Sequence, residues 1–442
     1  MRPAGTSLIA CVLVAWCALA AGPGGTTVSP HPLTYDGRAP DAPWREAARQ
    51  RIDAHRKALL TVQVADTDGN PLEGARVSIR MRRSVFPFGS ALSEDHLFPD
   101  VETEDTRQYR GHAARLFNAA TLEDGLRWPE WLNPVRHERT MRSIDWIEGQ
   151  GMELFGPNLI WPDWKWCPPE VQALADDPAA VDEAIRAHIS DELTALRGRA
   201  SRWVVVNEPT SNHEITDALG PDAIPQWFRW AHEADPDLQL YINDWGILAT
   251  TWGVQYEHEP YRDAYEATIR TVLESGAPIH GIGMQCHFAA RDETFDLLPP
   301  TRILEVLDRF SQFGLPIQIT ELDVHTMDER LQADYMRDFL TVAFSHPAVS
   351  GIMMWGFWSG RHWRPDAAMF RQDWSAKPVA EEWHRLVHDE WRTCDEATTD
   401  ARGEATFSGF LGEYSVEAYW QESVTTTTAT LGPGGAQLRI KR

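Results

Sequence analysis

Two glutamates follow short apolar runs, a position in which carboxyl groups can do acid–base chemistry. Glu208 follows residues 203–206, a run without a polar break that is typical of a strand buried on both faces. Glu321 follows a similar stretch at residues 315–320. In a parallel (β/α) barrel the carboxyl ends of the strands meet at one mouth, and two carboxyl groups there can hydrolyse a glycosidic bond. A single glutamate at a strand end is more often an exposed carboxylate, so the interpretation depends on the pair.

The residues around both glutamates resemble motifs of glycoside hydrolase family ten, the retaining xylanases. WVVVNEP, at residues 203–209, is similar to the acid/base motif of the family, and ITELDVH, at residues 319–325, is similar to its nucleophile motif. Further similar segments follow in the family's order, at residues 117–128, 240–247, 277–288 and 353–365. The resemblance extends over residues 86–386 and implies a barrel in which Glu208 is the acid/base and Glu321 the nucleophile.

These two roles require a defined spacing. In retaining enzymes the two carboxyl groups lie about 5 to 5.5 Å apart, and in inverting enzymes about 6.5 to 9.5 Å apart. The resemblance implies the shorter spacing. We expect the charge on Glu321 to raise the pKa of Glu208 and keep it protonated until Glu321 is glycosylated.

The resemblance also implies supporting residues. Asp323 and His287 are expected to form a hydrogen-bonded string to Glu321, which would fix the orientation of the nucleophile. Asn207 is expected to hydrogen-bond the sugar beside the cleavage point. The other expected substrate-binding residues are Glu123, Asp124, Arg127, Trp128, Asn158, Trp161, Gln285, Trp355 and Trp363. Outside such motifs, a lone histidine would more often be structural, and a lone tryptophan would belong to the core about as often as not.

Several positions depart from the family's pattern. Pro157 and Pro162 stand where the family has histidines, and the neighbouring Asn158 is a candidate to replace the histidine that touches the sugar. Asp124 and Arg127 stand where the family has asparagine and lysine, and a salt bridge between them is the alternative to sugar binding. These changes affect the identity of the glycan more than the type of reaction.

Strand and helix patterns alternate between residues 85 and 390, which predicts a TIM (β/α)₈ barrel of class α/β. The expected strands begin at Val85, Leu116, Glu153, Arg202, Leu238, Ile279, Leu315 and Gly351. On this assignment Glu208 ends the fourth strand and Glu321 the seventh. The two glutamates should therefore face each other across the mouth of the barrel.

Segments at both ends of the chain predict a small β-sandwich. Residues 58–84 alternate apolar and polar side chains around the turn DTDGNPLEG, and residues 391–442 alternate around further glycine turns. Together they resemble a carboxypeptidase-regulatory-like sandwich, with the barrel inserted between its halves. Two separate β appendages are the alternative, which a lack of strand pairing between the two segments would establish. Residues 22–57 are expected to form a linker and a charged helix.

The first 21 residues have the layout of a secretory signal peptide. Arg2 precedes an apolar run at residues 8–19, and small residues follow it. The run is too short for a comfortable membrane span. We therefore expect a secreted protein, extracellular or periplasmic, with no membrane association once the segment is removed.

Composition narrows the classes of partner and cofactor. A net charge of −24, from 41 basic and 65 acidic residues, disfavours nucleic acid and anionic membranes but is compatible with a neutral polysaccharide. The cysteines beyond the signal segment, Cys167, Cys286 and Cys394, show no metal-ligand spacing, so we expect free thiols with one disulfide possible. No metal and no cofactor are expected, and the protein is expected to be a monomer.

We predict a retaining hydrolase that cleaves β-1,4-xylosidic bonds in xylan by double displacement. A related β-glycosidase that acts on another β-glycan is one alternative, favoured by Pro157 and Arg127. The other alternative is a catalytically silent glycan-binding protein, which the intact pair Glu208 and Glu321 disfavours.

Overall fold

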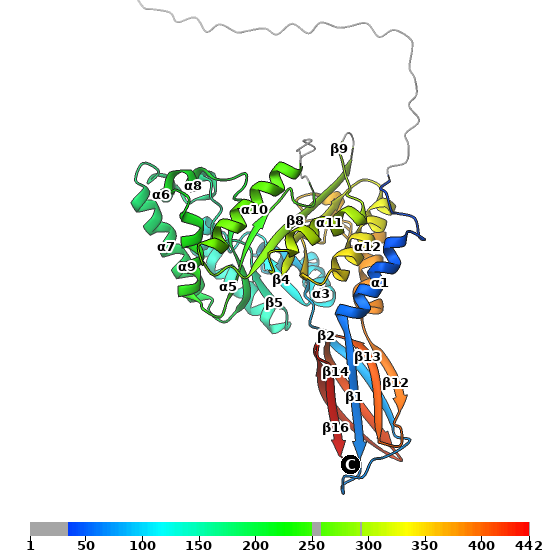
Figure 1. Ribbon diagram of the computed structural model, residues 1–442. Helices are drawn as coiled ribbons and strands as arrows, with labels where there is room; N and C mark the ends of the chain where they lie inside the picture. Colours follow the sequence, from blue (N-terminus) through cyan, green and yellow to red (C-terminus); the bar gives the residue numbers. More distant parts are fainter. Residues whose placement is uncertain (1–33, 250–257, 292–293, 442) are drawn as a thin grey trace, which may run out of the picture. The chain divides into compact units, whose positions relative to one another are not determined.

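The computed structural model describes residues 34–249, 258–291 and 294–441, and most of these form a closed parallel barrel with helices between its strands (Figure 1). Neighbouring strands pair in the order β3-β4-β5-β6-β7-β8-β10-β11, and β11 pairs with β3 to close the barrel. The strands are β3 (Phe88–Leu92), β4 (Ala119–Leu122), β5 (Glu153–Gly156), β6 (Ala200–Asn207), β7 (Gln239–Asp244), β8 (Gly281–Arg291), β10 (Ile317–His325) and β11 (Val349–Met354). The predicted (β/α)₈ fold is confirmed, with β6 as the fourth barrel strand and β10 as the seventh.

Helices lie before, between and after these strands, and some of them begin with a side-chain cap. Asp177 accepts a hydrogen bond from the backbone N–H of Ala180 at the start of α7, and Asp328 does the same for two N–H groups of α12. The helices are α1 (Pro43–Arg56), α2 (Glu94–Leu97), α3 (Glu104–Leu116), α4 (Trp128–Trp131), α5 (Pro134–Gly149), α6 (Pro169–Gln172), α7 (Pro178–Ala195), α8 (Glu214–Leu219), α9 (Ala223–Ala234), α10 (His258–Glu274), α11 (Pro300–Ser311), α12 (Glu329–Ser345) and α13 (Pro378–His384). Shorter segments are the 3₁₀ turns η1 (Trp164–Trp166) and η2 (Pro365–Ala367), the π-helical η3 (Arg385–Glu390) and strand β9 (Thr294–Asp296), which pairs antiparallel with β8.

Large side chains fill the barrel where a neighbour is small. A Cβ on Gly156 of β5 would lie 1.9 Å from the ring of Trp203 on β6, so only glycine leaves room for this fully buried indole. The register of β10 against β8 shifts between Ile319 and Glu321. A bulge of this kind redirects the side chains that follow it, and here it falls at Glu321.

The two ends of the chain build one β-sandwich. Strand β1 (Lys57–Ala65, blue in Figure 1) lies between β13 (Glu404–Phe410, orange) and β16 (Ala436–Lys441, red). The second sheet has the order β12 (Cys394–Thr398), β2 (Arg76–Ser84), β14 (Gly412–Trp420) and β15 (Ser423–Leu431). N-terminal strands thus pair with C-terminal strands in both sheets, and the alternative of two separate appendages is wrong. The resemblance to a carboxypeptidase-regulatory-like domain stays a prediction.

Further predictions concern the N-terminal signal segment, membrane association and the cysteines. The predicted signal segment, residues 1–21, lies outside the described residues. Within the described ranges no helix has the length and apolar character needed to cross a membrane. Cys167 and Cys286 are buried free thiols, and Cys394 is an exposed one.

Candidate active site

A cleft of about 610 Å³ lies where the carboxyl ends of the barrel strands meet, and both predicted catalytic glutamates line it. Glu208 is the residue after β6, and Glu321 lies in β10, opposite Gln285 of β8 in the strand register. The lining residues are Glu123, Arg127, Pro157, Asn158, Trp161, Lys165, Trp166, Asn207, Glu208, Ser211, Asn212, Trp245, Gln285, His287, Glu321, Trp355 and Trp363. The fold therefore brings the two carboxyl groups to one crevice.

The backbone at Glu208 adopts a left-handed conformation, with φ of 53°. Residues other than glycine rarely adopt this conformation, which is held here by hydrogen bonds on both sides of the residue. The N–H of Glu208 donates to the carbonyl of Asn243 at 2.8 Å, and its carbonyl accepts from the N–H of Asn212 at 2.9 Å. The chain thus turns sharply after β6 and presents the carboxyl group to the cleft.

The Glu208 carboxyl accepts one amide proton on each oxygen. Gln285 Nε2 donates to Oε1 at 2.8 Å, and Asn212 Nδ2 donates to Oε2 at 3.1 Å. Burial and, to a lesser degree, the charge of Glu321 raise the pKa of Glu208 to about 7, despite the bond from Gln285, which lowers it. The expected direction of the shift is therefore present, although burial rather than the neighbouring charge is its larger cause.

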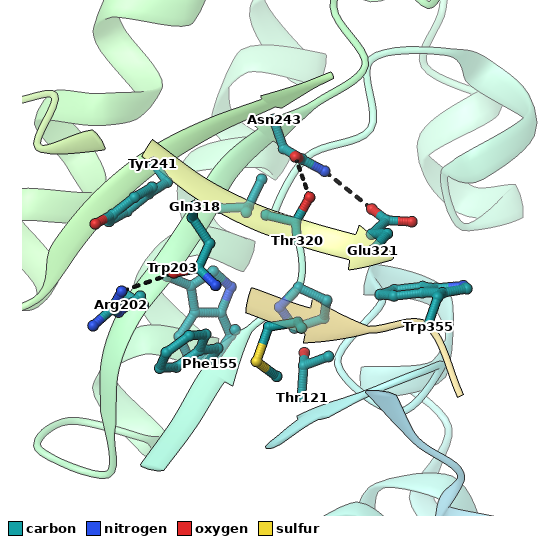
Figure 2. Close-up of a pocket in the computed structure, with 14 residues that line it drawn as sticks. Thr121, Phe155, Arg202, Trp203, Tyr241, Asn243, Gln318, Thr320, Glu321 and Trp355 are labelled. Carbon is teal, nitrogen blue, oxygen red and sulfur yellow. Dashed lines mark hydrogen bonds between the residues drawn. The ribbon is translucent and has the colours of Figure 1, made fainter. Parts of the chain in front are cut away.

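Glu321 is fixed by a donor on each oxygen. Asn243 Nδ2 donates to Oε1 at 3.0 Å, and Asn243 is itself held by the hydroxyl of Thr320 at 2.7 Å (Figure 2). His287 Nε2 lies 3.2 Å from Oε2. The other ring nitrogen of His287 lies 2.9 Å from Asp323 Oδ2, which also accepts from the indole N–H of Trp363 at 2.7 Å. The structure thus has the expected hydrogen-bonded string from Glu321 through His287 to Asp323.

The protonation of His287 follows from its two carboxylate neighbours. Burial alone would lower the pKa of His287, but Asp323 and Glu321 together raise it to about 9. Burial opposes ionisation of Asp323 as well, yet the positive charge of His287 holds the pKa of Asp323 below its usual value. At neutral pH both ring nitrogens therefore carry protons, and Nε2 donates to Glu321.

Three side-chain amides connect the two carboxyl groups. Asn243 Nδ2 donates to Asn207 Oδ1 at 2.8 Å as well as to Glu321. Gln285 Nε2 reaches the same oxygen of Asn207 at 3.5 Å while it donates to Glu208. Asn207, expected to contact the sugar, lines the cleft and also accepts within this network. Because Asn207 Oδ1 can only accept, it orients the amides of Asn243 and Gln285 so that their nitrogens also donate to Glu321 and Glu208.

The predicted sugar-binding residues divide into two groups. Glu123, Arg127, Asn158, Trp161, Gln285, Trp355 and Trp363 line the cleft. Trp128 instead lines an adjoining cavity of about 130 Å³ and stacks on His188 with ring centres 4.5 Å apart. Asp124 forms ion pairs with Arg127 at 3.1 Å and with Arg361 at 3.0 Å. The salt bridge considered for Asp124 is therefore present.

Several residues that line the cleft or contact its lining residues were not predicted as site residues from the sequence. They are Lys165, Trp166, Ser211, Asn212, Asn243, Trp245 and Arg361. Asn243 had a usable signal, because it lies near the end of a buried strand as Glu208 does. Lys165 and Asn212 lie in connections between strands and helices, where no periodic pattern indicates which side chains face the cleft.

A small cavity of about 30 Å³ lies behind Glu321, inside the barrel (Figure 2). Arg202 of β6 donates to Gln318 of β10 at 2.8 Å, and its guanidinium lies 4.3 Å from the centre of the Phe155 ring. These contacts join β5, β6 and β10 inside the barrel, beneath the residues that contact Glu321.

Comparisons with known proteins agree with this geometry. The chain is 27% identical over 377 residues to the anti-sigma-I factor RsgI6 of Acetivibrio thermocellus, covering 84% of this chain and 46% of that protein. It is 28% identical over 397 residues to endo-1,4-beta-xylanase 2 of Arabidopsis thaliana, covering 89% of this chain and 35% of that protein. The chain therefore spans less than half the length of both relatives.

Solved structures match the fold over the barrel. Native xylanase 10B of Thermotoga maritima aligns with a TM-score of 0.60 at 24% identity, covering 69% of this chain and 96% of that one. Xylanase 10B of Thermotoga petrophila, solved with xylobiose, aligns with a TM-score of 0.59 at 24% identity, covering 69% and 95%. The family model of glycosyl hydrolase family 10 matches residues 80–384. This match spans the barrel with both glutamates, and the chain belongs to glycosyl hydrolase family 10.

Proposed function

We propose that this protein is a retaining endo-β-1,4-xylanase, with Glu208 as acid/base and Glu321 as nucleophile. The observation that carries the proposal is the contrast between two carboxyl groups in one cleft. Burial raises the pKa of Glu208 to about 7, so this carboxyl group stays partly protonated at neutral pH, whereas Glu321 accepts from Asn243 and from a protonated His287. Family membership and the xylanase relatives support the choice of xylan.

In the first step a Glu321 oxygen attacks the anomeric carbon as the bond to the leaving sugar breaks. Glu208 gives its proton to the departing oxygen, and a covalent glycosyl-enzyme forms. Glycosylation removes the charge of Glu321, so Glu208 loses one of the causes of its raised pKa and becomes a base. In the second step Glu208 takes a proton from water, the hydroxyl oxygen bonds to the anomeric carbon, and Glu321 leaves as a carboxylate.

A panel of purified polysaccharides tests this function. Release of xylo-oligosaccharides from xylan, with the β-anomer appearing first in an NMR time course, is the expected result. First appearance of the α-anomer would contradict a retaining mechanism. Glu321→Ala should abolish release while its circular dichroism spectrum stays unchanged.

A β-glycosidase that acts on another β-glycan is the second candidate. It is favoured by Pro157, which lines the cleft where the family has a histidine, and by Asp124, which is engaged in ion pairs. Activity on another β-glycan together with no activity on xylan would establish it. A silent glycan-binding protein would show neither activity, yet would be retained on an insoluble glycan column.

We also propose that the protein is exported as a monomer, with residues 1–21 removed as a signal peptide. The layout of the N-terminal residues supports export. Mass spectrometry of the mature protein from the culture fluid or periplasm should show the loss of this segment. Size-exclusion chromatography with light scattering should give the mass of a single chain.

A further inference from the structure

Asn212 lies between the predicted acid/base and a lysine that reaches the cleft from another loop. Its side chain is buried, with 6% of the residue exposed. Asn212 Nδ2 donates to Glu208 Oε2 at 3.1 Å, and Asn212 Oδ1 accepts from Lys165 Nζ at 3.2 Å. Lys165 and Asn212 both line the catalytic cleft. The side-chain amide of Asn212 therefore bridges the Lys165 ammonium and the Glu208 carboxyl group by two hydrogen bonds.

Lys165 is itself anchored. Its Nζ lies 2.6 Å from Asp163 Oδ2, and the other oxygen of Asp163 accepts from the backbone N–H of Lys165 at 3.1 Å. The ammonium also lies 5.5 Å from the centre of the Trp166 ring. Because the aspartate holds one side of the ammonium, its remaining protons are directed to other acceptors, and Asn212 Oδ1 is one of them.

Two contacts select which way the Asn212 amide faces, the one from Lys165 to its oxygen and one from its nitrogen to the backbone carbonyl of Glu208 at 3.4 Å. A lysine ammonium can only donate hydrogen bonds, so it selects the amide oxygen and leaves the N–H₂ for Glu208. With the amide reversed, N–H₂ would face the ammonium and an oxygen would face Glu208. A reversed amide would favour the protonated form of Glu208, whereas the observed orientation favours the carboxylate.

We infer that Lys165 and Asn212 are positioning residues, which hold the Glu208 carboxyl in place and favour its ionised form in the second step of the reaction. The inference rests on the proposed role of Glu208 as acid/base. Neither residue was predicted from the sequence, and both lie in connections that follow β5 and β6.

Other charges act on the same carboxyl group. Glu321 and Asp244 oppose ionisation of Glu208, while His287 favours it. Asp163 beside Lys165 reduces the field of the ammonium, and Glu214 adjoins Asp163 in turn. When Glu321 becomes glycosylated its opposing charge disappears, but the contact through Asn212 remains. The contacts from Lys165 through Asn212 to Glu208, called the relay below, therefore make a larger share of the effect on the Glu208 pKa when Glu208 must take a proton from water.

Titration of Glu208 tests the relay without any need for turnover. The ¹³C NMR signal of the Glu208 carboxyl, assigned by its loss in Glu208→Gln, gives the pKa in the full chain. Asn212→Ala should raise this pKa by about 0.5 to 1 unit, the size expected for one lost amide hydrogen bond. Lys165→Met should raise it in the same direction by a smaller amount, because water screens the half-exposed ammonium and the Asn212 amide itself remains. The high-pH limb of kcat/KM should move up by the same amount, and Lys165→Arg should restore it.

A double variant separates the relay from a general charge effect. If Lys165 acts through Asn212, Lys165→Met should cause no further shift in the Asn212→Ala background. Lys57→Met is the matched control, since it removes the same charge at the start of the sandwich strand β1, where Lys57 pairs with Asp53 of helix α1. It should leave the titration of Glu208 unchanged.

Three outcomes would overturn the inference: an unchanged Glu208 titration in Lys165→Met, an equal shift in Lys57→Met, or a shift that persists in full without Asn212. A change in KM alone, with the pH profile intact, would also overturn it, because it would indicate a substrate contact. If the wild type hydrolyses no glycan, the proposed function is refuted, but the pKa of Glu208 can still be measured. The failure of the proposed function and the failure of this inference are therefore distinguishable.

Discussion

Asn243 donates through a single nitrogen to Glu321 Oε1 at 3.0 Å and to Asn207 Oδ1 at 2.8 Å, and thereby links Glu321 to the end of strand β6. Since Asn207 immediately precedes Glu208, this amide connects the two strand ends that present the carboxyl groups. The barrel supplies the strands, but side-chain amides fix the final geometry of the site.

Asn243→Ala should lower kcat by about 10- to 100-fold, because loss of the donor lets the nucleophile rotate away from the attacking geometry. KM on an aryl β-xylobioside should change little. Steady-state kinetics with a thermal melt of the variant check this prediction. An unchanged kcat would show that His287 alone suffices to orient Glu321.

The activity should decline as the pH rises through about 7. The raised pKa of Glu208 keeps its proton below this value, and deprotonation above it removes the general acid. The high-pH limb of kcat/KM should therefore have an apparent pKa near 7. A substrate with an activated aryl leaving group needs less proton donation, so its kcat should fall less steeply over the same range.

Glu208→Gln should make the fold more stable at pH 8. The native state binds the Glu208 proton more tightly than the unfolded chain, whose glutamates titrate near 4.5, so stability falls as pH rises from 4.5 to 7. The glutamine has no charge to bury, and the variant should gain about 3 kcal/mol at pH 8. Denaturant titrations at pH 8 and pH 4 check this, since the gain should vanish at the lower pH.

Gly156→Ala should destabilise the barrel, because its new methyl group would overlap the ring of Trp203. Overpacking of this kind costs about 1–3 kcal/mol. Gly149→Ala is the matched control, since a Cβ there meets no atom within 4 Å. Thermal melts of both variants should show a lower Tm for the first only, and an unchanged Tm would mean that β5 shifts to make room.

Local patterns in the sequence predicted the elements that carry the site. The apolar run before Glu208 and the alternation of strands and helices are local signals, because burial of a strand requires them wherever the strand lies. The pairing of the two chain ends in one sandwich also followed from alternation, since two strands alone are marginal in water. Strand β1 between β13 and β16 bears this out.

The cause of the Glu208 shift, the ion pairs of Asp124 and the contacts of Lys165, Asn212 and Asn243 came only from the tertiary structure. The sequence by itself determined the barrel, the sandwich and the two glutamates, because strand periodicity and family motifs are properties of short segments. It did not determine which loop side chains meet these glutamates, since hydrogen bonds between residues distant in the chain exist only once the barrel has closed.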